Sequence, residues 1–158
     1  MTQFLPTAAL VSLCLAAPVA ADQAALARLT GPDGLAVELT PEVLAALPVQ
    51  EVDTVHGGSH GETRGHYTGV LLWDVIAAET ALDDDVKAAL KHVVLVTARD
   101  DHQVAYAIGE IAPGFGDRPI LIGYELDGTP IPDGLRMVAP GDERGARYVK
   151  DVVSLEIR

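Results

Sequence analysis

Cysteine and positive charge are both scarce in this chain. Only Cys14 of its 158 residues is a cysteine, and 11 Lys and Arg stand against 23 Asp and Glu, for a net charge of −12. Such an acidic surface repels nucleic acid and anionic lipid, because both bind through positive patches. A single thiol closes no internal disulfide and builds no thiolate cluster for zinc. We therefore expect no nucleic-acid partner and a fold that depends on packing.

The N-terminal segment, residues 1–21, is predicted to be a secretory signal peptide. An apolar stretch, roughly Ala8 to Ala17, precedes a small-residue cleavage pattern at Pro18–Ala21. The positively charged start of a typical signal peptide is missing, and the alternative is a buried N-terminal helix. The stretch is too short to span a bilayer and no later one is long enough, so we expect no membrane anchor. The mature chain, residues 22–158, is expected to be exported to the periplasm without Cys14.

The mature chain is expected to form a single α+β domain. Its length and the 49% hydrophobic content of the sequence support one core and argue against disorder. Short alternating or β-branched runs predict many strands and few helices, without a regular strand–helix alternation. The expected strands are residues 35–39, 49–55, 92–98, 103–108, 120–126, 135–139 and 148–157, and the expected helices lie within 40–48, 67–76 and 83–90. Residues 23–30 fit a helix or a strand.

The segment from His56 to His66 contains three histidines and four glycines but little apolar content. It is predicted to be a surface loop, with a long hairpin connection as one form. His56 and His60 are four residues apart and, with His66, have a spacing that can chelate a divalent ion. The alternative, which we favour, is a solvated loop whose histidines only titrate, because no acid or thiol completes a standard metal motif. We therefore assign no metal site.

Positive charge is concentrated near the carboxyl end. Four of the 11 Lys and Arg fall between residues 136 and 150: Arg136, Arg144, Arg147 and Lys150. Glycines at 141 and 145 allow the backbone to approach a ligand closely. Arginine binds phosphate through two parallel hydrogen bonds and lysine adds a point charge, so this segment predicts a site for a small anionic ligand. The alternative is a solvated turn whose arginines pair with the abundant acids.

Three blocks of sequence, in the same order, resemble the molybdopterin-binding domain of the sulfite oxidase family. Residues 140–150, Pro-Gly-x-x-x-Gly-Ala-Arg-x-Val-Lys, are similar to its Pro-Gly…Gly-Ala-Arg-Ser-Val-Lys signature. Residues 120–131 are similar to its Leu-Ala-Tyr-Glu-x-Asn-Gly-Glu-Pro-Leu hairpin, and residues 68–76 to its Gly-Val-Pro-Leu-x-Asp-Leu-Leu helix entry. The resemblance implies a mainly-β α+β fold, molybdopterin as cofactor and oxidoreductase activity.

The resemblance also implies roles for individual residues. Arg147 and Lys150 would bind the pterin or its phosphate, Gly145 would allow close backbone approach, and Arg136 matches an arginine of the family's Gly-x-Pro-x-Arg strand. In the family a cysteine that ligates molybdenum precedes the helix entry, and the corresponding interval here, His56–His66, contains no cysteine. Imidazole is a poor substitute for thiolate at a soft site.

Two function hypotheses follow. The first is an exported oxidoreductase of the molybdopterin type, or its remnant, with His56 or His60 as an unusual ligand. The second is a non-catalytic periplasmic anion-binding or accessory module that kept the fold and lost the metal site. The retained Gly-Ala-Arg-x-Val-Lys segment favours the first hypothesis. The missing cysteine and the small size favour the second, as does the absence of a twin arginine, because export without that signal occurs before a cofactor is loaded. In both, the predicted site combines His56, His60, Arg136, Gly145, Arg147 and Lys150 around one cavity.

Overall fold

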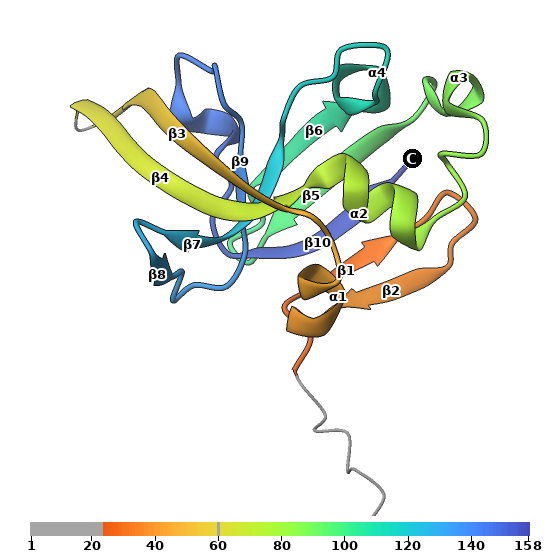
Figure 1. Cartoon of the computed structure of the whole chain (residues 1–158), viewed down its shortest axis with the longest axis horizontal. Helices are drawn as coiled ribbons and strands as arrows, with labels where there is room; N and C mark the ends of the chain where they lie inside the picture. The colour runs from red at the N-terminus through yellow and green to blue at the C-terminus, as the bar shows by residue number, and fades with distance from the viewer. Residues whose placement is uncertain (1–23, 60) are drawn as a thin grey trace, which may run out of the picture.

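The computed structural model describes residues 24–59 and 61–158, which form two five-stranded sheets and several short helices (Figure 1). The predicted α+β class is confirmed. The predicted signal peptide, residues 1–21, and His60 lie outside the described residues. None of the helices in the described part is long and apolar enough to cross a bilayer.

The first sheet has the strand order β2-β1-β10-β5-β6. Its strands are β1 (Ala27–Thr30), β2 (Ala36–Leu39), β5 (Val93–Ala98), β6 (Gln103–Ala107) and β10 (Val152–Ile157). Strand β1 runs parallel to β10, with Arg28 opposite Ser154, while the other neighbours are antiparallel. The alternative left open for residues 23–30 is therefore resolved in favour of a strand, because β1 completes its hydrogen bonds between β2 and β10.

The second sheet has the order β3-β4-β7-β8, with β9 beside β7. Its strands are β3 (Val49–Gly58), β4 (Gly61–Leu71), β7 (Leu121–Leu126), β8 (Thr129–Pro130) and β9 (Arg136–Val138). Asp127 and Gly128 both have positive φ (52° and 72°), as a two-residue hairpin turn between twisted strands requires.

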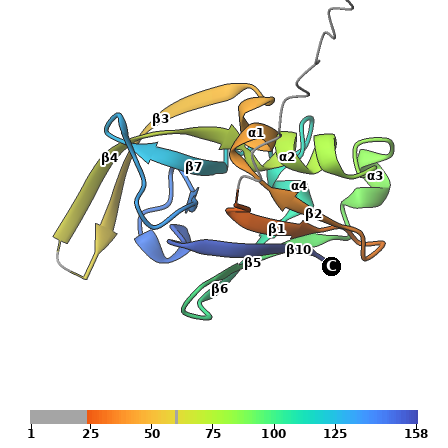
Figure 2. The same cartoon turned by 90° about the horizontal axis from the view of Figure 1, so that it is seen from below.

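The β3–β4 hairpin corrects the expectation of a loop between His56 and His66. Antiparallel pairing continues from Val49 opposite Val70 to Gly58 opposite Gly61, so residues 56–58 and 61–66 are strand. Figures 1 and 2 show this hairpin extending beyond the rest of the molecule. Backbone hydrogen bonds hold it there, since its distal half carries little apolar side chain.

The helices are short. They are α1 (Pro41–Ala45), α2 (Leu72–Glu79), α3 (Val86–Ala89), α4 (Ile108–Ile111) and the 3₁₀ turn η1 (Gly145–Arg147). The Thr40 hydroxyl caps α1 by accepting from Val43 N at 3.4 Å, as expected for Thr before Pro at a helix start. Helix α2 buries Trp73, Val75 and Ile76 in the core, whereas α4 was not expected from the sequence.

Candidate functional site

An open groove of about 670 Å³ lies between the β3–β4 hairpin and residues 144–150. Four of the residues that line it are cationic: Arg64, Arg136, Arg144 and Lys150. No Asp or Glu of residues 24–59 and 61–158 lines it. In a chain with a net charge of −12, this surface is a local reversal of charge. A concave surface lined by one sign of charge concentrates counter-ions of the opposite sign, here anions.

The two walls of the groove are joined by backbone contacts. Gly57 N–H of β3 donates to Glu143 O at 2.8 Å, and Gly57 forms a parallel bridge with Arg144. A Cβ on Gly145 would lie only 2.6 Å from His56 Nδ1, which is closer than side-chain carbons approach. A glycine at 145 therefore lets η1 pack closely against β3. The hairpin, residues 49–71, and residues 144–150 are at least 73 residues apart in sequence, yet they line one groove.

Three of the lining cations have no carboxylate partner. Arg136, Arg144 and Lys150 form no ion pair with any Asp or Glu of residues 24–59 and 61–158. Arg64 pairs with Glu62 at 2.6 Å, but both side chains are more than half exposed, so this pair contributes little. Arg136 Nη1 donates to Tyr67 Oη at 3.3 Å, which leaves the rest of its guanidinium available.

Aromatic rings form the inner wall of the groove. The ring of Tyr148 lies 4.0 Å from that of His56, centroid to centroid, and 6.5 Å from that of Tyr67. Burial raises the pKa of the Tyr148 phenol, so it is a neutral hydrogen-bond donor at physiological pH. The nearby Thr54 hydroxyl opposes this shift, but its own hydrogen bond goes to Gly65 O at 3.3 Å.

Polar atoms on the groove wall lack partners. His56 Nδ1, Arg136 Nε and Tyr148 Oη are buried, and none has a hydrogen-bond partner among the described residues. A buried polar atom without a partner costs roughly 1–3 kcal/mol. The three atoms come from β3, β9 and the segment after η1, and all three residues line the same groove. A ligand with several acceptor atoms would satisfy the two donors among them.

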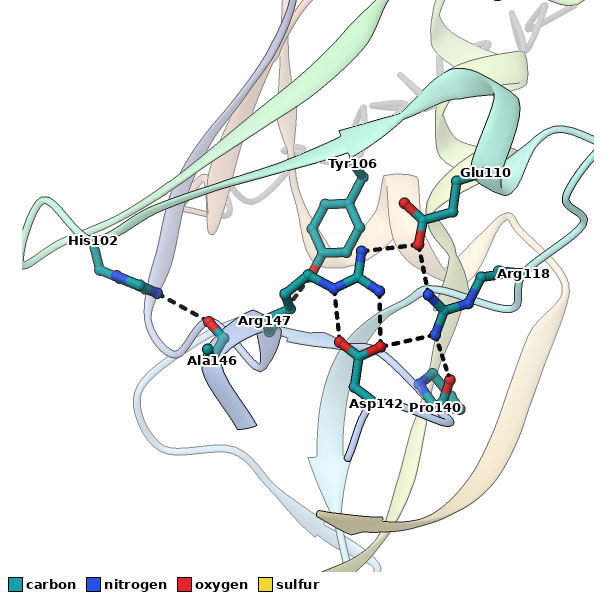
Figure 3. Close-up of polar contacts among 8 residues, drawn as sticks. All are labelled: His102, Tyr106, Glu110, Arg118, Pro140, Asp142, Ala146 and Arg147. Carbon is teal, nitrogen blue, oxygen red and sulfur yellow. Dashed lines mark hydrogen bonds and ion pairs between the residues drawn. The ribbon is translucent and has the colours of Figure 1, made fainter. Parts of the chain in front are cut away.

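Arg147 does not line the groove, and its guanidinium lies between two acids (Figure 3). Its Nε and Nη2 donate to the two oxygens of Asp142 at 2.7 and 2.8 Å, and Nη1 donates to Glu110 Oε1 at 2.8 Å. Arg118 donates to the same two carboxylates, at 2.7 Å to Glu110 and 2.9 Å to Asp142. The guanidinium of Arg147 also lies 5.2 Å from the centre of the Tyr106 ring.

These contacts alter the electrostatics of the cluster. The hydrogen bonds from Arg147, and then those from Arg118, lower the pKa of Asp142 to about 2, although partial burial opposes them. The same carboxylate raises the pKa of Arg147. Burial raises the pKa of Tyr106, whose hydroxyl donates to Arg147 O. Every charge in the cluster is thus matched: three of the five N–H donors of Arg147 bind carboxylates, and its side chain does not line the groove.

The structure brings together most of the residues predicted from the sequence. His56, Arg136, Gly145 and Lys150 line the groove, whereas Arg147 does not, and His60 lies outside the described residues. His66 also stays out of the groove: its Nδ1 donates to Asp53 Oδ1 at 2.9 Å. In the described ranges, no three His, Cys, Asp or Glu side chains are grouped so as to hold a metal ion.

Among the charged and aromatic residues that line the groove, four were not assigned to the site from the sequence: Arg64, Tyr67, Arg144 and Tyr148. Arg144 belongs to the predicted cationic cluster, so its charge could have identified it as a site residue. Tyr148 directly follows Arg147 in residues 136–150, the segment predicted to bind an anion. Arg64 and Tyr67 lie in β4, and nothing in their local pattern indicates that they face residues 136–150.

Comparisons with known proteins give a fold but no family. No protein-family model matches the chain, and no curated protein sequence matches it. Among solved structures, the chain is similar to the sulfane dehydrogenase SoxCD from Paracoccus pantotrophus, with a TM-score of 0.64 and 17% sequence identity. The match covers 83% of this chain and 37% of that one, so the chain spans well under half of the protein it resembles. At this identity the likeness shows a shared fold, here one found in an oxidoreductase.

Proposed function

We propose that the groove binds a small anion carrying at least two negative charges, and that the chain is a non-catalytic binding or accessory module with an oxidoreductase-like fold. The observation that carries this proposal is the lining of the groove. Unpaired Arg136, Arg144 and Lys150 converge there with buried, unpartnered polar atoms and without any acid. Several uncompensated cations favour a multivalent anion, because each further charge on the ligand meets another partner.

Molybdopterin, the cofactor that the sequence resemblance implies, fits this groove only in part. The cations and the Tyr148 hydroxyl suit a phosphate group. The metal end has no matching protein ligand, since the described residues contain no cysteine and no metal-binding cluster. Cys14, the only cysteine, belongs to residues 1–23, which the structure does not describe. The residues present therefore support binding of an anion and not a molybdenum–thiolate centre, and we derive no reaction from them.

An oxidoreductase is the second candidate, and the fold shared with a sulfane dehydrogenase favours it. Expression of the whole chain, including residues 1–21, with a molybdenum source separates the two candidates. Elemental analysis for molybdenum and fluorescence of the oxidised pterin are measured on the same purified sample. Both signals at one equivalent per chain would favour the oxidoreductase, and the absence of both would favour the binding module.

Anion binding is tested by calorimetric titration with sodium pyrophosphate, with acetate as a monovalent comparison. We expect saturable pyrophosphate binding and much weaker acetate binding. Arg136→Gln should weaken pyrophosphate binding about 10- to 100-fold, the range for loss of a charge-assisted hydrogen bond. Lys91→Gln is the matched control, because Lys91 also forms no ion pair with any acid of the described residues but lies outside the groove. Equal losses in the two variants would overturn the proposed site.

We also propose export to the periplasm, supported by the apolar stretch and cleavage pattern of residues 1–21. Intact mass of the protein recovered from the periplasmic fraction tests this proposal. A mass that begins at Asp22 is expected. A chain that retains Met1 and stays with the cytoplasmic fraction would contradict it.

A further inference from the structure

We infer that Arg147 is a positioning residue: together with Glu110, Arg118 and Asp142 it holds Arg144 and Lys150 toward the groove. These four residues are called the ion cluster below. The inference rests on the proposed anion binding and assigns a second role within the cationic segment.

The ion cluster is a closed ring of contacts. Each of the two carboxylates, Glu110 and Asp142, accepts hydrogen bonds from both arginines, Arg118 and Arg147 (Figure 3). The four side chains are between 17% and 33% exposed, so water screens these pairs less than it screens surface pairs. Removing one member leaves an opposite charge without a partner in a partly buried place, which is costly.

The ion cluster fixes both ends of the segment that carries Arg144. Asp142 lies two residues before Arg144 and Arg147 three residues after it. Arg118 Nη2 also donates to Pro140 O at 2.9 Å, so the chain is held from Pro140 onward. The backbone between the two fixed ends, at Glu143 and Arg144, is the part that contacts Gly57 of β3.

Side chains at the β5–β6 hairpin hold the other face of η1. Tyr106 Oη donates to Arg147 O, and His102 Nε2 lies 3.1 Å from Ala146 O (Figure 3). None of the four residues of the ion cluster, nor Tyr106 or His102, lines the groove. Arg144 and Lys150 line it and form no ion pair with any acid of the described residues. The arrangement separates arginines that support the segment from cations that are free to bind.

Long-range electrostatics and positioning predict opposite changes in pyrophosphate affinity for one substitution, Asp142→Asn. Asp142→Asn keeps the size of the side chain and removes a negative charge near an anion-binding groove. If charge alone mattered, pyrophosphate would bind more tightly to this variant. If the ion cluster positions the segment, binding weakens, because the amide cannot hold two guanidinium groups as the carboxylate does.

The experiment measures pyrophosphate affinity and amide exchange in the same set of variants. Binding by the wild type and its loss in Arg144→Ala establish the proposed function independently. Asp142→Asn is then expected to bind at least 10-fold more weakly and to speed hydrogen exchange at Gly57 N–H, which donates to Glu143 O. Glu38→Gln, which breaks a surface pair with Arg28, is the matched control and should change neither quantity.

A series of milder variants separates loss of positioning from unfolding of the whole chain. Arg147→Lys keeps the charge and part of the contacts, so its affinity should lie between those of the wild type and Arg147→Met. If Asp142→Asn does not fold, Arg118→Lys replaces it with the same expectation. Unchanged or tighter binding by a folded Asp142→Asn would overturn the positioning role. No binding by the wild type would overturn the proposed function instead.

Discussion

Arg144 and Arg147 lie three residues apart, yet they occupy opposite sides of one segment. Arg147 is 25% exposed and is held by two carboxylates, whereas Arg144 is exposed, lines the groove and has no carboxylate partner among the described residues. Both are arginines of the same short segment, so neither their charge nor their place in the sequence distinguishes them. The acids that each meets in the fold decide whether an arginine supports the structure or remains free for a ligand.

The largest expected difference between the two sides is in stability. Arg147→Ala removes a partly buried partner of Asp142 and Glu110 and should lower the free energy of unfolding by about 2–3 kcal/mol, between the values for exposed and buried pairs. Arg144→Ala should change it by about 0.5 kcal/mol or less, as at other exposed positions. Urea denaturation measures both. Similar losses of unfolding free energy in the two variants would contradict a structural role for Arg147 that Arg144 does not share.

Acidification should weaken the ion cluster by protonating Asp142. Because the pKa of Asp142 is lowered to about 2, against about 3.9 in an unfolded chain, its carboxylate stabilises the fold above pH 4. That contribution is lost as the pH falls from about 4 through about 2. Denaturation of the wild type and Asp142→Asn between pH 2 and 5 should show a stability difference that shrinks on acidification. A constant difference would argue against the lowered pKa.

The contact between η1 and β3 can be tested with a single methyl group. Gly145→Ala would place a Cβ 2.6 Å from His56 Nδ1 and push the His56 ring against Tyr148. We expect a loss of about 1 kcal/mol of stability, typical of overpacking, and weaker pyrophosphate binding. Gly109→Ala is the matched control, because Gly109 lies outside the groove and its Cβ would come no closer than 3.4 Å to any side chain of the described residues. Equal effects at the two glycines would contradict the close packing.

The smallest expected effect concerns His66, the histidine outside the groove. Its hydrogen bond to Asp53 raises its pKa above 6.5. The pair therefore stabilises the fold fully below the unfolded pKa, and this contribution disappears as the pH rises through the folded value. In an NMR titration the pKa of His66 should fall when Asp53→Asn is introduced. No change in that variant would show that Asp53 is not the cause.

Local sequence patterns predicted much of the fold. The helices expected within residues 40–48 and 83–90 contain α1 and α3, and the strands expected at 120–126 and 135–139 contain β7 and β9. The distal part of β3 and β4 could not be recognised as strand, because its glycines and polar residues pair through the backbone and leave no alternating pattern. Residues 27–30 became a strand through a parallel partner, β10, that lies more than 120 residues away.

The candidate site was predictable in composition and less so in geometry. The cationic cluster and the histidine segment were identified from residue types, and His56, Arg136, Gly145 and Lys150 line one groove. Arg147 could not be separated from them, since one of its partners, Glu110, is 37 residues away and belongs to a helix with no sequence signal. Pairing across such distances depends on the fold, so the role of an arginine depends on it too.

An amide NMR titration of the folded chain with pyrophosphate tests the proposed anion site most directly. We predict saturable shifts confined to the groove, at Gly57, Arg144, Gly145, Tyr148 and Lys150, with Gly109 and Glu110 behind the ion cluster little affected. Shifts spread over the surface, or no saturable shifts at millimolar pyrophosphate, would contradict an anion site between the hairpin and the carboxyl-terminal segment.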